Sequence, residues 1–514
     1  MLRSTAVFSA MTLLSRIAGY LRDWLQASLF GAGPAVSAFV VAYRIPNYLR
    51  RIFAEGSFSS AFVPVLMEFK QRGDERALQD FLDHVAGALL AIVVVVSGLG
   101  MLLAPWIARL FLLFADESKS EMVGMTAEML RITFPYLTFI SMTALAGAVL
   151  NSFRHFGLPA LTPVLHNLGV IAAMLLLGNM LNVPAKALAW GVLGAGILQL
   201  LLLWPAMGRL GLRPRIKLNL RHEGVRRVFK LMLPTIFSSS VSQVNLLVGT
   251  VFASLLVVEA QSWLYYSDRL TELPLGLFGV AIGTVILPQL SRHFADADAP
   301  GYSRSLDWGL RMVLLVGMPA ALGLALLAEP LTASLFNYGA FTAEDTRMVG
   351  YSLTAMSIGI PAFMLSKVLL PAFYARQDTR TPMRAALLTV LANVLLTIAF
   401  VTPLWLQGIK AAHTGIAAAT ALAGMFNAAL LWRYLRQQGV YNAEPGWGRW
   451  VLRIVLAMIA MATVVLGVRG WVGEWAALPT LWRWLWLLAA VAAGAVAYGT
   501  VLLLSGLRPR HLRH

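Results

Sequence analysis

Long apolar runs recur along the whole of this 514-residue chain, and they constrain its fold more than any other feature. A helix needs about 20 apolar residues to cross the roughly 30 Å hydrocarbon core of a bilayer. With 59% hydrophobic and only 13% charged residues, the chain differs from soluble proteins, which average about 45–50% and 25%. We therefore predict an all-α integral membrane protein. The apolar runs indicate fourteen spans, near 5–30, 35–69, 84–113, 130–152, 159–182, 186–207, 229–256, 261–291, 309–328, 348–375, 382–404, 411–434, 450–468 and 482–505. The second and eighth are longer than the bilayer as straight helices, so we expect a bend near Gly56–Ser57 in the second and softening points at Pro274, Gly276, Gly279 and Gly283 in the eighth.

The composition also excludes several classes of function. The chain has no Cys, which excludes disulfides, zinc–thiolate sites and cysteine nucleophiles. Its eight His show neither HxxxH nor HExxH spacing, so we predict no metal site and no cofactor. The net charge of +17 fits the bias of Lys and Arg toward cytoplasmic loops, and we expect no nucleic-acid partner.

The positive charges predict the orientation of the chain. Loops on the side of the N-terminus hold 26 Lys and Arg, the opposite loops hold seven, and the remaining eight of the 41 lie within spans. The positive-inside rule then places both termini in the cytoplasm. Arg16 and Arg22 interrupt the first apolar run and no small-residue cleavage site follows, so we interpret it as a retained helix and not a signal peptide.

An internal repeat divides the chain. Four landmark pairs lie 224 to 226 residues apart: Pro64 with Pro288, Pro105 with Pro330, Pro135 with Pro361, and Asn167 with Asn393. Each copy contains six spans, an even number, so both copies have the same orientation in the membrane. We predict two pseudo-symmetric six-helix lobes, 1–222 and 223–440, followed by two C-terminal helices in 441–514. These last helices either pack simply against lipid or form an apolar groove able to hold a long isoprenoid tail.

Charged side chains inside the predicted spans are concentrated in a few of them. A charge at mid-bilayer costs at least about 2.5–3.5 kcal/mol and persists mainly beside a watery cavity. Spans 1, 2, 7 and 8 are equivalent in the repeat, so we expect the charges on spans 1, 2 and 8 to converge where the halves meet. Arginines exceed carboxylates there, which predicts an anion-binding cavity suited to bidentate phosphate contacts. The charges are Arg16, Arg22 and Asp23 in span 1, Arg44, Arg50, Arg51 and Glu55 in span 2, and Asp268, Arg269 and Glu272 in span 8.

Four segments resemble the lipid II flippases, the MurJ or MviN family, within the superfamily of drug, oligosaccharidyl-lipid and polysaccharide exporters. They are SRIAGYLRD at 15–23, YRIPNYLRRIFAEGSFSSAFVPV at 43–65, YYSDRLTELPLGLFGVAIGTVILPQLS at 265–291 and FYARQDTRTP at 373–382. The resemblance covers essentially all of the chain. It implies fourteen helices in two lobes, a bacterial inner-membrane location, and translocation of undecaprenyl-diphosphate-linked disaccharide-pentapeptide (lipid II) from the cytoplasmic to the periplasmic leaflet by alternating access. It implies a transporter, not an enzyme.

The resemblance also assigns site residues. It implies substrate binding by Arg16, Arg22, Arg50, Arg269, Ser15, Asn47 and Ser262, and gating or counter-ion roles for Arg51, Glu55, Asp268, Glu272 and Arg44. Ser37 stands where many members carry an acid, which puts an outer gate based on that carboxylate in doubt. Span 7 has no acid for a sodium site, so membrane potential or protons are the expected driving force. The expected partners are lipid II and membrane lipids, and transient contact with the peptidoglycan synthesis machinery is compatible with this role.

Three alternatives remain open from the sequence. One is a flippase for another polyprenyl-diphosphate-linked glycan, of the O-antigen or capsule type. A drug or cation antiporter should have an acidic cavity, and this chain has a basic one. A membrane-embedded glycosyltransferase usually carries carboxylate catalysts in a sizeable outer loop, whereas the outer loops here are short.

Overall fold

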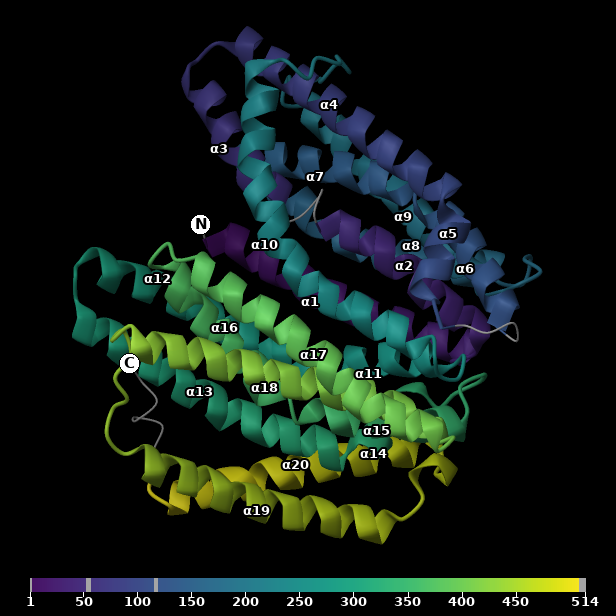
Figure 1. The fold of residues 1–514 in the computed structure, drawn as a ribbon, viewed down its shortest axis with the longest axis vertical. Coiled ribbons are helices and arrows are strands. Elements are labelled where there is room, and N and C mark those ends of the chain that lie inside the picture. The colour runs from purple at the N-terminus through teal and green to yellow at the C-terminus, as the bar shows by residue number, and fades with distance from the viewer. Residues whose placement is uncertain (1, 52–56, 115–118, 508–514) are drawn as a thin grey trace. The chain divides into compact units, whose positions relative to one another are not determined.

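The computed structural model describes residues 2–51, 57–114 and 119–507, and this part of the chain is helical without a strand. It forms two compact units, Met1–Gln261 and Ser262–His514. The helices of the first unit (Figure 1) are α1 (Leu2–Phe30), α2 (Pro34–Arg50), α3 (Ser57–Gln71), α4 (Glu75–Leu102), α5 (Ala104–Phe111), α6 (Ser120–Thr133), α7 (Tyr136–Ser152), α8 (Gly157–Leu177), α9 (Lys186–Gly208) and α10 (Glu223–Ala253).

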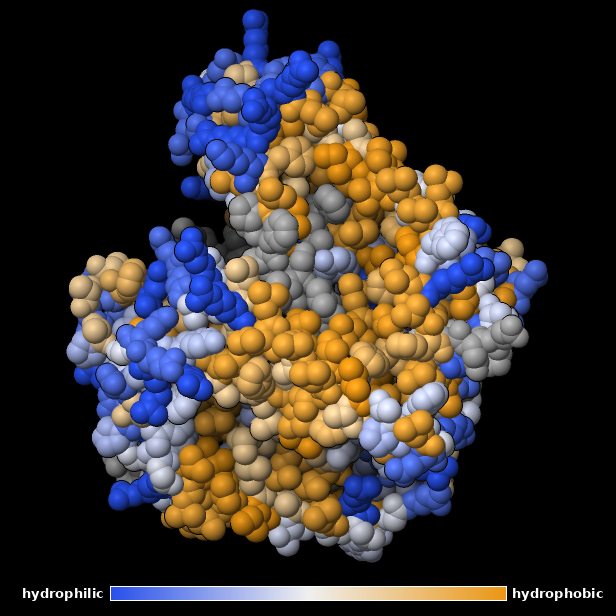
Figure 2. Space-filling model, viewed as in Figure 1, coloured by the Kyte–Doolittle hydropathy of each residue, from blue (hydrophilic) through white to orange (hydrophobic). Residues whose placement is uncertain are grey.

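The second unit holds the rest of the chain, and α11 begins at the boundary between the units. Its elements are α11 (Ala260–Pro274), the π-helix η3 (Leu275–Gly279), α12 (Val280–Ala295), α13 (Ala299–Leu326), α14 (Ala328–Phe336), α15 (Ala343–Ser357), α16 (Ile360–Tyr374), α17 (Arg380–Leu406), η4 (Lys410–Ala412), α18 (His413–Gln437), α19 (Trp447–Val472), η5 (Trp475–Ala477) and α20 (Thr480–Leu504). Figure 2 shows apolar side chains along the middle of the helices and hydrophilic ones gathered near helix ends.

The order of helices repeats as the proline landmarks predict. α4 and α13 both have 28 residues and begin 224 residues apart, and each is followed by a short helix with a proline near its start. Pro64 lies inside α3 and Pro288 inside its counterpart α12. The structure groups α10 with the first unit, whereas the repeat makes residue 223 the start of the second half. The domain boundaries drawn from the repeat stay a prediction.

Nine helices in the described part of the chain are long and apolar enough to cross a membrane, or ten if the pair α15–α16, bent by 44°, counts as one span. The predicted spans outside this set are the first, second, seventh and eighth. α1 carries buried charge, α2 and α11 are short at 17 and 15 residues, and α10 contains the polar sequence SSSVSQVN. The membrane-spanning, all-helical class is established, and the count of fourteen spans stays a prediction.

The two longest predicted spans are interrupted, since a straight helix of either length would exceed the bilayer. In the second span, α2 ends at Arg50 and α3 begins at Ser57. Gly56, part of the predicted bend, lies outside the described residues. In the eighth span the π-helix of η3 separates α11 from α12, and it follows Pro274, one of the predicted softening points. A π-helical turn often marks such a functional break.

The third predicted span begins earlier than expected. The span was predicted from residue 84, but α4 begins at Glu75, where the carboxylate of Asp74 accepts hydrogen bonds from the first backbone N–H groups. Asp83 is buried against the segment that joins α9 to α10. The polar first turns of α4 are therefore covered by protein.

Candidate functional site

A polar cluster joins α1 to α8 in the first unit. The Arg22 guanidinium donates to the Asp23 carboxylate at 2.7 and 3.1 Å and to the Asn167 side-chain oxygen at 3.1 Å. The Asn167 amide donates in turn to the backbone oxygen of Ser15 at 3.0 Å. Two predicted site residues on α1, Ser15 and Arg22, are thus tied to one residue of α8.

The surroundings of this cluster make Arg22 costly to replace. Asp23 is 4% exposed and the Arg22 side chain is 13% exposed. A buried carboxylate requires a partner, because its transfer from water costs several kcal/mol. Arg22 therefore stabilises the packing of α1 on α8 in this conformation, in addition to any contact with substrate. Arg16, on the same helix, is half-buried.

The predicted residues of α2 form two separate contacts. The Arg50 Nε donates to the Asn47 side-chain oxygen at 3.0 Å, one helical turn back. Arg44 donates to the hydroxyl of Thr250 on α10 and, at 3.2 Å, to the side-chain oxygen of Gln261. These last two acceptors are neutral, so this contact positions the Arg44 charge without cancelling it. Arg51 is half-buried just beyond the helix end, and Glu55 lies outside the described residues.

The predicted residues of the second unit lie on α11. Arg269 donates to the Glu272 carboxylate at 3.0 Å, and its guanidinium lies 5.0 Å from the Tyr265 ring centre. The Glu272 side chain is 61% exposed, whereas Asp268 is half-buried and Ser262 is buried. An exposed ion pair contributes only about 0–1 kcal/mol. The contact between Arg269 and Glu272 therefore contributes little stability by itself.

The structure thus brings together only part of the predicted set. Ser15 and Arg22 meet through Asn167, Asn47 meets Arg50, and Arg269 meets Glu272. Arg269 lies in the second unit, whereas Arg16, Arg22 and Arg50 lie in the first. The predicted convergence of these four arginines therefore stays a prediction.

Three partners of the predicted arginines were not expected as site residues. Thr250 and Gln261 hold Arg44, and they also bond to each other through the Gln261 amide and the Thr250 carbonyl at 2.7 Å. The sequence does not single out Thr250 and Gln261, because neutral side chains do not stand out in a helix as charged ones do. Asn167 did carry a signal, because it recurs as Asn393 in the repeat, but its contact with Arg22 requires the fold.

A second feature is an apolar groove of about 1060 Å³ within the second unit. It is lined by α13, α16, α18, the start of α19 and the segment before it, and Figure 2 shows apolar side chains over α18 and α19. We call it the apolar groove. Its lining includes Leu314, Met318, Leu365, Met425, Ala429, Trp432 and Met458.

One rim of the apolar groove is fixed by a buried carboxylate. Asp307 on α13 accepts hydrogen bonds from the Tyr441 hydroxyl and the Trp447 Nε1, both at 2.7 Å, and pairs with Arg311 at 2.7 Å. Burial, together with the hydrogen bond to Asp307, raises the pKa of Tyr441. The segment between α18 and α19 is thereby held against α13, which shapes the groove independently of a bound molecule.

Two repeated sets of helices, arginines on elements outside the long apolar spans, and an apolar groove within the second unit are features of a membrane transporter. The family model described as lipid II flippase MurJ matches residues 26–485. The chain belongs to this family, which is a family of transporters and not of enzymes.

Individual relatives carry the same family name as the matching model. A probable lipid II flippase MurJ from Haemophilus influenzae is 41% identical over 517 residues, covering 98% of this chain and 99% of the relative. A lipid II flippase MurJ from Burkholderia cenocepacia is 41% identical over 474 residues, covering 91% and 89%. A solved lipid II flippase MurJ in an inward closed conformation superposes with a TM-score of 0.80 at 26% identity, covering 96% and 98%. A solved inward-facing multidrug resistance transporter, of the MATE family within the MOP superfamily, shares the fold, with a TM-score of 0.68 at 13% identity over 83% of this chain and 95% of that one.

Proposed function

We propose that this chain carries lipid II across the bacterial inner membrane, from the cytoplasmic to the periplasmic leaflet, by alternating access of its two halves. Membership of the lipid II flippase family supports the substrate class. The observation that carries the proposal is the placement of the arginines. They lie on α1, α2 and α11, elements outside the set of long apolar spans, as expected for helices that face an aqueous cavity.

In this account the diphosphate of lipid II binds Arg16, Arg22, Arg50 and Arg269. Planar guanidinium groups match phosphate oxygens in pairs, which a lysine ammonium cannot do. Arg269 is suited to contact with the diphosphate, since its ion pair with Glu272 is exposed. Ser15, Asn47 and Ser262 complete the predicted binding set, and Asn47 already orients Arg50. Asp268 and Glu272 serve as counter-ions when the cavity is empty.

The apolar groove accommodates the isoprenoid tail in our proposal. Its volume of about 1060 Å³ is at the upper end of ordinary ligand pockets, which measure about 300–1,000 Å³. Its lining is mostly Leu, Met, Ala and Trp, and it ends at the polar rim set by Asp307 and Arg311. A tail in this groove would remain in an apolar environment while the head group crosses between the halves.

Membrane potential is the driving force that we favour. A cluster with an excess of arginines is cationic when empty and is neutralised by the diphosphate. One elementary charge moving through 100 mV gains about 2.3 kcal/mol. An inward-negative potential would therefore return the empty cationic cavity to its inward-open state, and both termini would face the cytoplasm throughout.

The proposal is tested by replacement of the resident flippase. The chain is expressed in a bacterial strain whose own lipid II flippase is depleted, and growth and cell shape are followed. We expect growth to be restored. Failure of a normally inserted chain to restore growth, with another polyprenyl-linked glycan accumulating when the chain is removed from its own host, would assign it to that other glycan.

A further inference from the structure

The segment 209–222, which joins α9 to α10, lies tightly on α4. The backbone N–H of Arg215 donates to the Asp83 carboxylate at 2.8 Å, and the N–H of Lys217 donates to the Asp83 carbonyl at 3.3 Å. A Cβ atom at Gly87 would lie 2.1 Å from the Lys217 carbonyl oxygen, so only glycine permits this approach. These contacts place the start of α10 beside α4.

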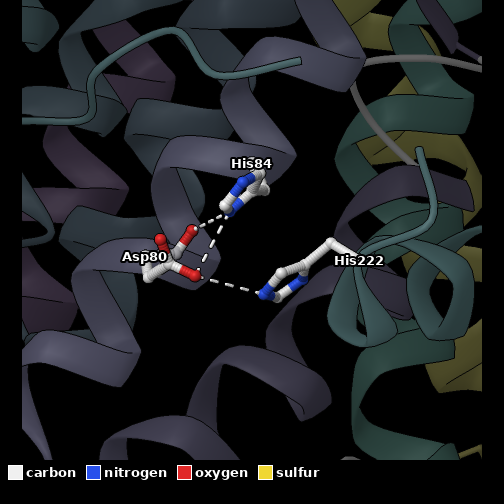
Figure 3. Close-up of side chains that lie close together, drawn as sticks. All are labelled: Asp80, His84 and His222. Atoms are coloured by element: carbon white, nitrogen blue, oxygen red, sulfur yellow. Dashed lines mark hydrogen bonds and ion pairs between the residues drawn. The ribbon is translucent and has the colours of Figure 1, made fainter. Parts of the chain in front are cut away.

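Three metal-ligating side chains meet at this junction (Figure 3). Asp80 and His84 are one turn apart on α4, and His222 is the N-cap of α10. One ligand atom from each lies within 4.8 Å of the other two. The Asp80 Oδ2 is 3.3 Å from Nδ1 of His84 and 3.4 Å from Nε2 of His222, and the two imidazole rings stack with centres 4.6 Å apart.

These separations suit a transition-metal ion. Zinc binds nitrogen and carboxylate oxygen at about 2.0–2.2 Å in a tetrahedron, which places neighbouring ligand atoms about 3.3–3.5 Å apart. The Nδ1 of His84 is 2.8 Å from the Asp80 backbone oxygen. Coordination through this Nδ1 therefore requires the ring proton of His84 to be on Nε2, and it displaces the contact with that carbonyl. The Asp80 side chain is 47% exposed, so an ion and a completing water molecule can reach the site.

The charges around the site favour a cation. The Lys217 ammonium contacts the other Asp80 oxygen at 3.2 Å and Asp83 at 2.9 Å, leaving Oδ2 of Asp80 toward the imidazoles. Two carboxylates against one ammonium leave one net negative charge beside the two imidazoles.

We propose that Asp80, His84 and His222 form a binding site for a divalent transition-metal ion, with zinc as the ion that best fits two imidazoles and a carboxylate. Binding fastens the start of α10 to α4 and so fixes the segment that joins the two halves of the repeat. The spacing of the histidines alone predicts no such site, because His222 reaches the other two only in the folded chain. The inference does not depend on the transported substrate.

Binding has a defined consequence for α10. The Nδ1 of His222 accepts a hydrogen bond from the Gly224 N–H at 3.2 Å and caps the helix. A metal ion on Nε2 requires the ring proton to move to Nδ1, which then no longer accepts the hydrogen bond from Gly224. Metal binding therefore breaks this cap, and the bound ion holds the N-terminus of α10 in its place. His222→Asn is therefore a suitable variant, because Asn keeps a capping oxygen and removes the distal nitrogen.

The experiment measures zinc binding to the purified full-length protein in detergent. The protein carries no polyhistidine tag and is stripped of metal with a chelator, and calorimetric titration with Zn²⁺ is compared with cobalt absorption spectra. We expect one ion per chain, a higher Tm with zinc, and affinity at least tenfold weaker in both His84→Gln and His222→Asn. Asp80→Asn, at a half-exposed position, provides a third variant if either histidine variant is unstable.

The matched control is His293→Gln. His293 pairs with Asp298 at 2.9 Å, an Asp–His contact outside the three-ligand group. We expect zinc binding in this variant to equal that of the native chain. The absence of zinc binding by the native protein, unchanged affinity in both cluster histidine variants, or loss of binding in His293→Gln would each overturn the proposal.

Discussion

Arg22 and Arg269 are assigned the same role but occupy different surroundings. Arg22 compensates a buried carboxylate and fixes α1 on α8, whereas Arg269 pairs with an exposed carboxylate on its own helix. Loss of function in an Arg22 variant would therefore combine damage to the fold with loss of substrate contact. An Arg269 variant should instead show the loss of substrate contact without damage to the fold.

Arg269→Ala should abolish support of growth with little change in Tm. The ion pair with Glu272 is exposed, so its loss removes about 0–1 kcal/mol at most. Arg269→Lys should also be impaired, because the ammonium keeps the charge and loses the paired phosphate contact. Growth complementation, membrane abundance and thermal unfolding in detergent are measured together. Arg433→Ala, an exposed arginine of α18, is the control that should keep full function. Normal growth with Arg269→Ala would remove Arg269 from the binding site.

Arg22→Ala should lower stability as well as function. It leaves Asp23 buried without its ion pair, a change that typically costs about 3–5 kcal/mol. The double variant Arg22→Ala/Asp23→Ala should recover much of the Tm and still fail to support growth. If the double variant supports growth, Arg22 has only a structural role.

At the scale of elements, the apolar groove is the feature most open to direct test. Ala429→Trp on α18 should fill part of the groove and reduce lipid II transport without unfolding the protein, since Ala429 is exposed on the groove wall. Ala492→Trp on α20 is the matched control, at an exposed position outside the groove lining. Transport is measured by growth complementation at equal membrane abundance. Equal activity of the two variants would contradict occupation of this groove by the tail.

The elements also show how far the sequence could predict the structure. Apolar runs and prolines predicted the helical class, the repeat, and the interruptions in the second and eighth spans. The start of α4 was placed too late, because Asp83 is covered by the 209–222 segment, which no local pattern reveals. The bonds of Arg44 to Thr250 and Gln261 join residues far apart in sequence, so only the fold identifies them.

At the scale of the whole molecule, the distribution of Lys and Arg makes a prediction about topology. Reporter fusions at residues 222 and 514 should both report the cytoplasm, and fusions at 183 and 474 should report the periplasm. Fusions at residues 32 and 258, inside the pairs of spans that hydropathy does not identify, should also report the periplasm, and the full pattern would support fourteen spans. A periplasmic signal at residue 222 would contradict the six-span repeat unit.

The leaflet in which lipid II resides after loss of this protein tests the central claim most directly. Cells depleted of the chain are treated with an external enzyme that cleaves only periplasm-exposed lipid II, and both the cleaved fraction and the total pool are measured. The account predicts that the cleavable fraction disappears while the total pool rises, and that expression of the native chain reverses both changes. An unchanged cleavable fraction would contradict a role for this chain as the lipid II flippase.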